Sequence, residues 1–436
     1  MKKFFTTIKN IFSIEDLRVR IINTLLLLVI FRLGSYVVLP GLDPVILQQA
    51  GIGQKGIFGL LDTFLGGAFS KASIFALGIM PYISASIVVQ LMTVALPYFQ
   101  RMQREGESGR NRINQLTRVL TILITIAQSL GYLTTTIPSE AIMVDRLFFT
   151  VSSVIILTSG TIFTMWLGER ITDKGIGNGI SMLIMIGIVS RLPVALIQES
   201  SSKFTNGEYL FFIIEVVVLF FVVMGVIMLT QAVRKVPVQY AKQVVGNKVY
   251  GGQRQYIPLK VNAAGVMPII FAQSFMFLPA LIIPYVESTF VAGFADYTSW
   301  PYNLLFALLI IVFTYFYTAI SFNPNQIADD MKRNGGFIPG IKPGVQTAEY
   351  IDTVLSRTIL SGSIFLALVA IMPAVAVLLG VAGEFAQFYG GTSLLIMVGV
   401  ILDTLQQINS YLLMRRYEGL MKSGKFKGRS ENIAMA

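Results

Sequence analysis

The stretches GIMPYI (residues 78–83) and GVMPII (residues 265–270) interrupt two long apolar runs, one in each half of the chain. A glycine followed three residues later by a proline bends or breaks a helix. The proline lacks an N–H, and its ring crowds the carbonyl four residues back. Glycine and proline are also common in ordinary membrane helices, so it is the matching of the two breaks that matters. Matched interruptions in two halves of a membrane protein indicate a pathway between those halves.

The composition is that of an integral membrane protein. The chain is 54% hydrophobic and 13% charged, whereas soluble domains carry about 25% charged residues. A bilayer core about 30 Å thick requires about 20 mostly apolar residues per helix. Ten runs meet this requirement: 21–39, 73–97, 117–137, 147–167, 179–197, 209–230, 263–285, 303–321, 357–380 and 392–412.

The chain contains no cysteine and no histidine. Disulfides, thiol chemistry and the usual zinc or haem ligand sets are therefore excluded, apart from sets made of carboxylates. No GxxxxGK[ST] phosphate-binding motif is present either. We expect no catalytic residue, no metal site, no cofactor and no enzymatic activity.

The distribution of basic residues predicts the orientation. With ten spans, both chain ends lie on one side of the membrane, and all but six of the 34 Lys and Arg residues fall on that side or in the loops facing it. This bias predicts a multi-pass protein with both termini in the cytoplasm. The parts on that side are an amphipathic interfacial helix over 1–20, two basic loops over 231–262 and 322–357, and a tail over 413–436.

Residues 56–72 form an apolar segment that is too short to span the membrane, with Asp62 and Thr63 inside it. Backbone at membrane depth that does not span must be buried in protein or line a water-filled cavity. The segment therefore predicts a short re-entrant helix that turns back at Gly66-Gly67. An external interfacial helix is the alternative.

Few ionisable residues lie within the predicted spans. Arg32 and Asp403 could pair with each other or cap polar helix contacts, and Glu215 is close enough to a span end to reach water. The isoleucine pairs Ile79/Ile83 and Ile180/Ile184 each share a helix face, and Ile270 follows the second break. Such residues usually serve packing, but if they converge they make a dry constriction that excludes water.

Several long motifs resemble the bacterial SecY family over essentially the whole chain. They are GGAFSKASIFALGIMPYISASIVVQL (66–91), EGESGRNRINQLTR (105–118), MWLGERITDKGIGNGIS (165–181), LKVNAAGVMPIIFA (259–272), FNPNQIADDMKRNGGFIPGIKPG (322–344) and GGTSLLIMVGVILD (390–403).

The resemblance implies an all-α membrane protein with ten transmembrane helices. Two pseudo-symmetric, inverted-repeat halves, 21–197 and 209–412, would form a clamshell around an hourglass pore, joined by an external hinge loop over 198–208. It also implies a short re-entrant plug helix over 57–70. The implied plug residues are Ile57, Phe58, Leu60, Leu61, Thr63, Phe64 and Leu65, and the implied pore ring is Ile79, Ile83, Ile180, Ile184, Ile270 and Ile396.

The function implied is that of the central subunit of a protein-conducting channel in the bacterial plasma (inner) membrane. Unfolded preproteins with signal sequences would cross the pore, and apolar segments would leave sideways between the second and seventh spans. Polar residues that could latch this lateral gate are Ser84, Ser86, Gln90 and Asn262.

The implied partners are the small subunits SecE and SecG, the SecA ATPase, the ribosome, YidC, SecDF and anionic lipids. The expected docking residues are Arg234, Lys235, Lys242, Lys248, Arg254, Lys332, Arg333 and Lys342. The family loop usually reads GIRPG, whereas this chain has GIKPG (340–344), so the docking role of Lys342 is open.

Two other classes remain possible from the residues alone. A secondary transporter with inverted repeats would need a charged or polar cluster at mid-membrane, which this sequence barely offers. A membrane scaffold or insertase without a pore is the other.

Overall fold

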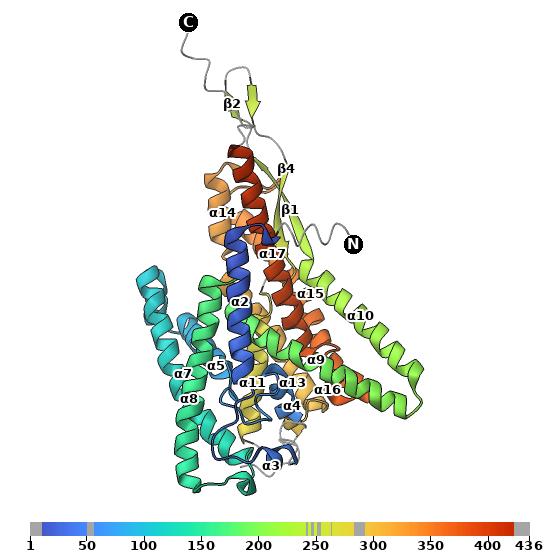
Figure 1. The fold of residues 1–436 in the computed structure, drawn as a ribbon. Coiled ribbons are helices and arrows are strands. Elements are labelled where there is room, and N and C mark those ends of the chain that lie inside the picture. Colours follow the sequence, from blue (N-terminus) through green and yellow to red (C-terminus); the bar gives the residue numbers. More distant parts are fainter. Residues whose placement is uncertain are drawn as a thin grey trace.

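The computed structural model describes residues 11–49, 56–240, 243–245, 248–250, 254–262, 264–282 and 293–422. The fold is dominated by helices (Figure 1), and a helix occupies each of the ten predicted apolar runs. These helices are α2 (Glu15–Gly34), α5 (Met80–Ala95), α7 (Glu107–Thr135), α8 (Arg146–Lys174), α9 (Gly179–Thr205), α10 (Tyr209–Gln231), α11 (Met267–Ile282), α13 (Trp300–Ser321), α15 (Val345–Leu378) and α17 (Gly391–Lys422).

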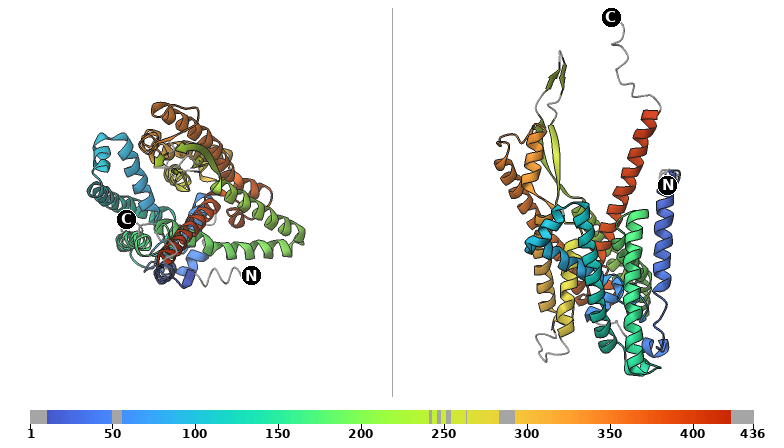
Figure 2. Two further views of the ribbon diagram at one scale, coloured as in Figure 1. Left: turned by 90° about the horizontal axis from the view of Figure 1, so that it is seen from above. Right: turned by 90° about the vertical axis from the view of Figure 1, so that its left-hand side faces the viewer.

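Seven helices in the described residues are long and apolar enough to cross a membrane. An eighth span is reached if α5 and α6 (Pro97–Arg104), which are bent by 98° at Leu96, count as one. The two remaining members of the ten are α2, which begins with charged residues, and α11, which is short within the described residues. Helix α2 begins and α17 ends on the side of the molecule that carries the strands (Figures 1 and 2).

Helices α5 and α11 begin at the two predicted breaks and are not bent by them. Pro81 and Pro268 are each the second residue of their helix, where a missing N–H costs nothing because no intrahelical partner exists. The glycines lie just before the helices in the left-handed region, with φ of +51° at Gly78 and +65° at Gly265. The matched motifs therefore start helices after irregular segments.

The first basic loop contains strands that the sequence analysis did not predict. Strand β1 (Val233–Tyr240) pairs antiparallel with β4 (Arg254–Lys260), and β5 (Gly336–Phe337) from the second basic loop pairs with the end of β1. Strands β2 (Gln243–Val245) and β3 (Lys248–Tyr250) form a separate pair. Val236 and Val238 pack with residues of α14 (Pro324–Arg333) and α15, which explains why this loop is ordered as a ribbon.

Glycines let irregular backbone approach the helices closely. A Cβ added to Gly160 of α8 would lie 2.1 Å from the carbonyl oxygen of Ile74, and one on Gly187 of α9 would lie 2.2 Å from that of Phe64. The end of α4 (Gly56–Phe64) and the irregular segment that follows it therefore pack directly against the backbone of α9 and α8.

We expect Gly160→Ala to destabilise the protein because its methyl group would collide with a fixed carbonyl. Overpacking of this kind costs about 1–3 kcal/mol. The measurement is the unfolding temperature in detergent. Gly225→Ala on α10 is the control, since the nearest heavy atom to its Cβ is 4.0 Å away. Equal unfolding temperatures for the two variants would contradict this packing.

Candidate functional site

The six isoleucines predicted as a pore ring all belong to one apolar cluster. Five are at most 7% exposed, and Ile180 is half-buried against them. They come from the start of α5, from α9, from α11 and from α17, so both halves of the chain contribute. Isoleucine side chains coordinate no ion and form no hydrogen bond, so a constriction made of them excludes water. The role of these six residues as a ring around a passage stays a prediction.

The predicted plug contains α4, a helix of nine residues that contacts α9. Leu61, Thr63, Phe64 and Leu65 are buried, and Phe64 belongs to the same cluster as the isoleucines. The backbone of Ile57, Phe58 and Leu60 is helical, while their side chains lie outside the described residues.

The chain turns after α4 at Gly66-Gly67, as the sequence predicts. Both glycines have positive φ, +62° and +88°. A Cβ on Gly66 would lie 2.9 Å from the Cα of Gly187, so this turn also packs on the backbone of α9.

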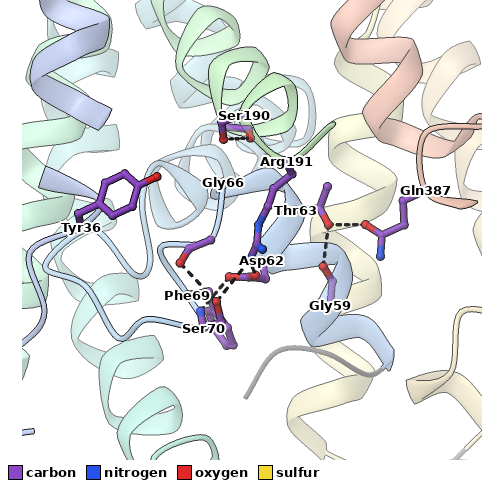
Figure 3. A network of polar contacts seen from close by, with 12 residues as sticks. Tyr36, Gly59, Asp62, Thr63, Gly66, Phe69, Ser70, Ser190, Arg191 and Gln387 are labelled. Atoms are coloured by element: carbon purple, nitrogen blue, oxygen red, sulfur yellow. Dashed lines mark hydrogen bonds and ion pairs between the residues drawn. The ribbon is translucent and has the colours of Figure 1, made fainter. Parts of the chain in front are cut away.

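An ion pair within the membrane-embedded body holds α4 to α9 (Figure 3). The Asp62 carboxylate pairs with the guanidinium of Arg191 and also accepts the N–H of Ser70 at 2.8 Å. The side chains of Asp62 and Arg191 are only 7% and 24% exposed. Arg32 donates to the carbonyl oxygen of Gly66 at 2.6 Å. The structure thus places three charged groups around the turn that follows α4.

A second polar contact joins α4 to the other half of the chain. The Thr63 hydroxyl lies 3.0 Å from the Gly59 carbonyl oxygen and meets the side-chain amide of Gln387, just before α17. Tyr297 lines the same small pocket as these residues. Burial, and secondly the Asp296 carboxylate, raise the pKa of Tyr297, so its phenol stays neutral at physiological pH.

Sequence reasoning missed Arg191 and Gln387 as partners of the plug segment. Asp62 inside an apolar segment was a visible signal, but its partner is 129 residues away in sequence. Arg32 contacts Gly66 and the Tyr36 ring, so it caps a polar contact and does not pair with Asp403. The expectation that Glu215 reaches water is wrong, because it is 6% exposed and lies 3.5 Å from Lys203.

The predicted lateral-gate helices α5 and α11 contact each other. Ser84 lines a small pocket together with Leu61, Leu65 and Ser274 of α11. Gln90 donates to Ser86 at 3.4 Å within α5.

Asn262 lies elsewhere, in a second pocket beside Asp403, and its side-chain oxygen has no hydrogen-bond partner. Among the described side chains, no hydrogen bond joins α5 to α11. The latching role of these four polar residues stays a prediction.

The predicted docking residues are gathered on the strand-bearing side. Arg234 and Lys235 are exposed on β1, Lys332 and Arg333 are exposed at the end of α14, and Lys342 is exposed between β5 and α15. The pairing of β1 with β5 joins the two basic loops into one platform. Lys242 lies outside the described residues, as do the side chains of Lys248 and Arg254.

These features define a class: a multi-pass helical membrane protein in which a short helix, α4, packs against an apolar cluster formed by both halves. The family model described as SecY matches residues 73–405. The protein translocase subunit SecY of Streptomyces coelicolor is 42% identical over 437 residues, covering 96% of this chain and 100% of that one. The corresponding subunit of Halalkalibacterium halodurans is 44% identical with the same coverage. The chain therefore belongs to the SecY family.

Solved structures agree in fold. One described as a protein conducting channel has a TM-score of 0.66 at 15% identity, covering 90% of this chain and 92% of that chain. A second, a SecY channel described as having a plug domain that stabilises its closed state, has a TM-score of 0.62 at 16% identity, with the same coverage. At such identity the likeness concerns the fold alone.

We expect Asp62→Asn to loosen α4, because it leaves the partly buried Arg191 without its counter-charge. Removing one partner of a buried pair costs about 3–5 kcal/mol. Since the chain has no cysteine, the single change Leu65→Cys introduces one thiol, whose rate of maleimide labelling reports how exposed residue 65 is. This rate should rise at least about tenfold in the Asp62→Asn background.

The matched control is Glu105→Gln. Glu105 pairs with Arg112 at 3.8 Å, with side chains 51% and 64% exposed, and such surface pairs contribute little. Labelling of Leu65→Cys should not change in this background. If Asp62→Asn labels no faster than this control, the ion pair does not hold α4.

Proposed function

We propose that the chain is the central pore-forming subunit of a protein-conducting channel. It passes unfolded secretory polypeptides across the membrane and releases apolar segments sideways between α5 and α11. The observation that supports this most directly is the apolar cluster that unites Ile79, Ile83, Ile180, Ile184, Ile270 and Ile396 with Phe64 of α4. The curated relatives are named as protein translocase subunits.

An isoleucine ring suits a cargo of variable sequence. It closes around any passing chain by apolar contact and offers no hydrogen bonds that would trap the cargo. When no polypeptide passes through the ring, the plug over 57–70 fills the part of the pore beside it. The channel needs no catalytic residue, because this chain supplies a path and its partners supply the energy.

Partitioning decides between export and insertion. An apolar segment of about 20 residues gains about 25 cal/mol per Å² when it leaves an aqueous pore for lipid, and a polar segment gains nothing. A gate held by few polar contacts opens easily for a signal sequence, since each interhelical hydrogen bond in a membrane contributes only about 0.6–2 kcal/mol.

The proposed location is the bacterial plasma (inner) membrane, with both termini cytoplasmic. Under this topology, the platform of β1, β5 and α14 faces the cytoplasm and docks SecA and the ribosome. A structural neighbour is described as Sec61 in a canine ribosome-channel complex, with a TM-score of 0.61 at 15% identity. SecE and SecG would complete the complex, with YidC, SecDF and anionic lipids as further partners.

Opening the ring should make the membrane leak. Replacing Ile79, Ile184 and Ile270 together with serine, in a channel lacking residues 57–70, places hydroxyls at the constriction and lets water and ions enter. We expect the single-channel conductance of reconstituted vesicles to rise at least several-fold over that of the channel lacking only the plug. Ile155→Ser, on an exposed face of α8, is the control. If the triple variant conducts no better than this control, the isoleucines do not form the pore constriction.

Charge reversal on the platform should weaken docking. The double change Arg234→Glu and Lys235→Glu, or Lys342→Glu alone, should lower the affinity for ribosomes or SecA by about tenfold. The ribosome affinity should also fall steeply with salt if rRNA phosphates are bound. Arg146→Glu at the opposite end of the helices serves as the control. Unchanged affinity in the platform variants would place docking elsewhere.

A further inference from the structure

A glycine-rich turn, GIGNG (residues 175–179), connects α8 to α9 and leads directly into the predicted pore ring. Ile180 is the second residue of α9, and Ile184 lies one turn further along the same face of that helix. Asn178 caps the helix, because its Oδ1 atom accepts the N–H of Ser181 at 3.2 Å. A shift or rotation of this turn therefore moves two of the six isoleucines.

Two hydrogen bonds hold the turn within its own half of the chain. Ile176 donates its N–H to the hydroxyl oxygen of Thr24 on α2 at 3.0 Å. Gly179 donates its N–H to the hydroxyl oxygen of Thr172 on α8 at 2.9 Å. Since α2, α8 and α9 all belong to the N-terminal half, these two bonds fix the turn relative to that half alone.

A third hydrogen bond joins the turn to the other half of the chain. Gly177 donates its N–H to the Oε1 atom of Gln407 on α17 at 2.9 Å. Gly177 is buried, with φ of +82°, and a Cβ on it would lie 3.2 Å from the hydroxyl oxygen of Thr404. A buried N–H that loses its acceptor is unfavourable, so the position of this glycine depends on Gln407.

Looser contacts also bring α17 to the turn. Ile176 and Ile408 belong to one apolar cluster. Arg20 of α2 donates to the carbonyl oxygen of Gly175 at 3.1 Å, and its guanidinium lies 5.6 Å from the centre of the Tyr411 ring. Hydrophobic contact is non-directional, whereas a hydrogen bond weakens steeply when it is bent. Among these contacts of α17 with the turn, the Gln407 bond is the directional one.

Helix α17 carries both a ring residue and the residue that holds the turn. Gln407 lies 11 residues after Ile396, which is about 16 Å along the helix at about 1.5 Å per residue. Helices α9 and α17 contact each other. Because both residues lie on one continuous helix, the bond from Gly177 to Gln407 also holds the start of α9 in register with Ile396.

We propose that Gln407 is a positioning residue of the pore. Through Gly177 it holds the start of α9, so that Ile180 and Ile184 keep their place in the ring relative to Ile396. This inference rests on the proposed role of the isoleucines as the constriction. The Gln407 side chain is itself exposed, so replacing it removes a hydrogen-bond acceptor and little packing.

The first test measures the ion conductance of the complete channel complex in reconstituted vesicles, with residues 57–70 removed so that the ring alone limits the current. Gln407→Leu removes the acceptor, and we expect the conductance to rise at least several-fold because two ring side chains are no longer held in place. Gln407→Glu keeps an acceptor oxygen at the same position. It should therefore restore the conductance to within about twofold of the channel that lacks only the plug.

Gln406→Leu is the matched control. It changes the same residue type one position away, where the side chain lines a pocket beside Gln231 of α10, and it should leave the conductance unchanged. Ile180→Ser is the positive control, since it opens the ring directly and should raise the conductance.

A second measurement follows the hydrogen bond itself. In the complete complex with its plug, the backbone amide of Gly177 should exchange its hydrogen about tenfold faster in Gln407→Leu than in Gln406→Leu, as expected for the loss of one hydrogen bond. Gln407→Glu should exchange at the rate of the unchanged channel.

Three results would overturn the inference. Equal exchange at Gly177 in Gln407→Leu and Gln406→Leu would show that Gln407 does not hold the turn. Faster exchange without a rise in conductance would show that the bond does not position the ring, provided that Ile180→Ser does raise the conductance. If Ile180→Ser also leaves the conductance unchanged, the ring assignment fails and this inference fails with it. A raised conductance that Gln407→Glu does not restore would assign the effect to a general loosening of α17.

Discussion

The structure depends on hydrogen bonds that satisfy the N–H and C=O groups of non-helical backbone inside a membrane-spanning protein. The chain between α4 and α5 is not helical, and lipid offers no hydrogen bonds to its N–H and C=O groups. Its N–H groups bond to backbone carbonyls of the segment itself, of α4 and of Val37, or to the side chains of Asp62 and Ser73. Side chains of three surrounding helices donate to three of its carbonyl oxygens. Arg32 of α2 donates to Gly66, Tyr132 of α7 donates to Phe69 at 2.7 Å, and Thr164 of α8 donates to Gly78 at 3.1 Å. These bonds allow the chain to stay irregular between a short helix and the late start of α5.

The same segment is fixed more firmly to one half of the chain than to the other. Gly160 and Gly187 bring it against the backbone of α8 and α9, where no side chain can yield. The Asp62–Arg191 pair adds a charged contact to α9. From the opposite half, the Thr63–Gln387 contact is the polar link in the described residues. Helix α4 therefore has more polar contacts with the N-terminal half than with the C-terminal half.

Local patterns predicted the fold well because lipid imposes a simple rule on apolar length. All ten predicted runs contain helices, and the short helix over Gly56–Phe64 and the Gly66-Gly67 turn lie where the glycine spacing predicts them. The β-ribbon was not predicted, because its pairing and its packing on α15 are decided by residues distant in sequence. The partners of Asp62 and Glu215 were missed for the same reason. A lone charge in an apolar run shows that a partner exists, but not which residue it is.

The two matched breaks look alike in sequence yet differ in how closely their surroundings are packed. A Cβ on Gly78 would lie 2.3 Å from Leu65, and the Gly78 carbonyl is bonded to Thr164. No heavy atom comes within 4 Å of a Cβ on Gly265, which lines a pocket beside Asn262, whose Oδ1 has no hydrogen-bond partner among the described residues. Shifting the start of α5 would break close packing and a hydrogen bond, whereas the start of α11 has room on the pocket side. Where α5 and α11 contact each other, the start of α5 is therefore the closely packed side, and the start of α11 borders open space on its pocket side.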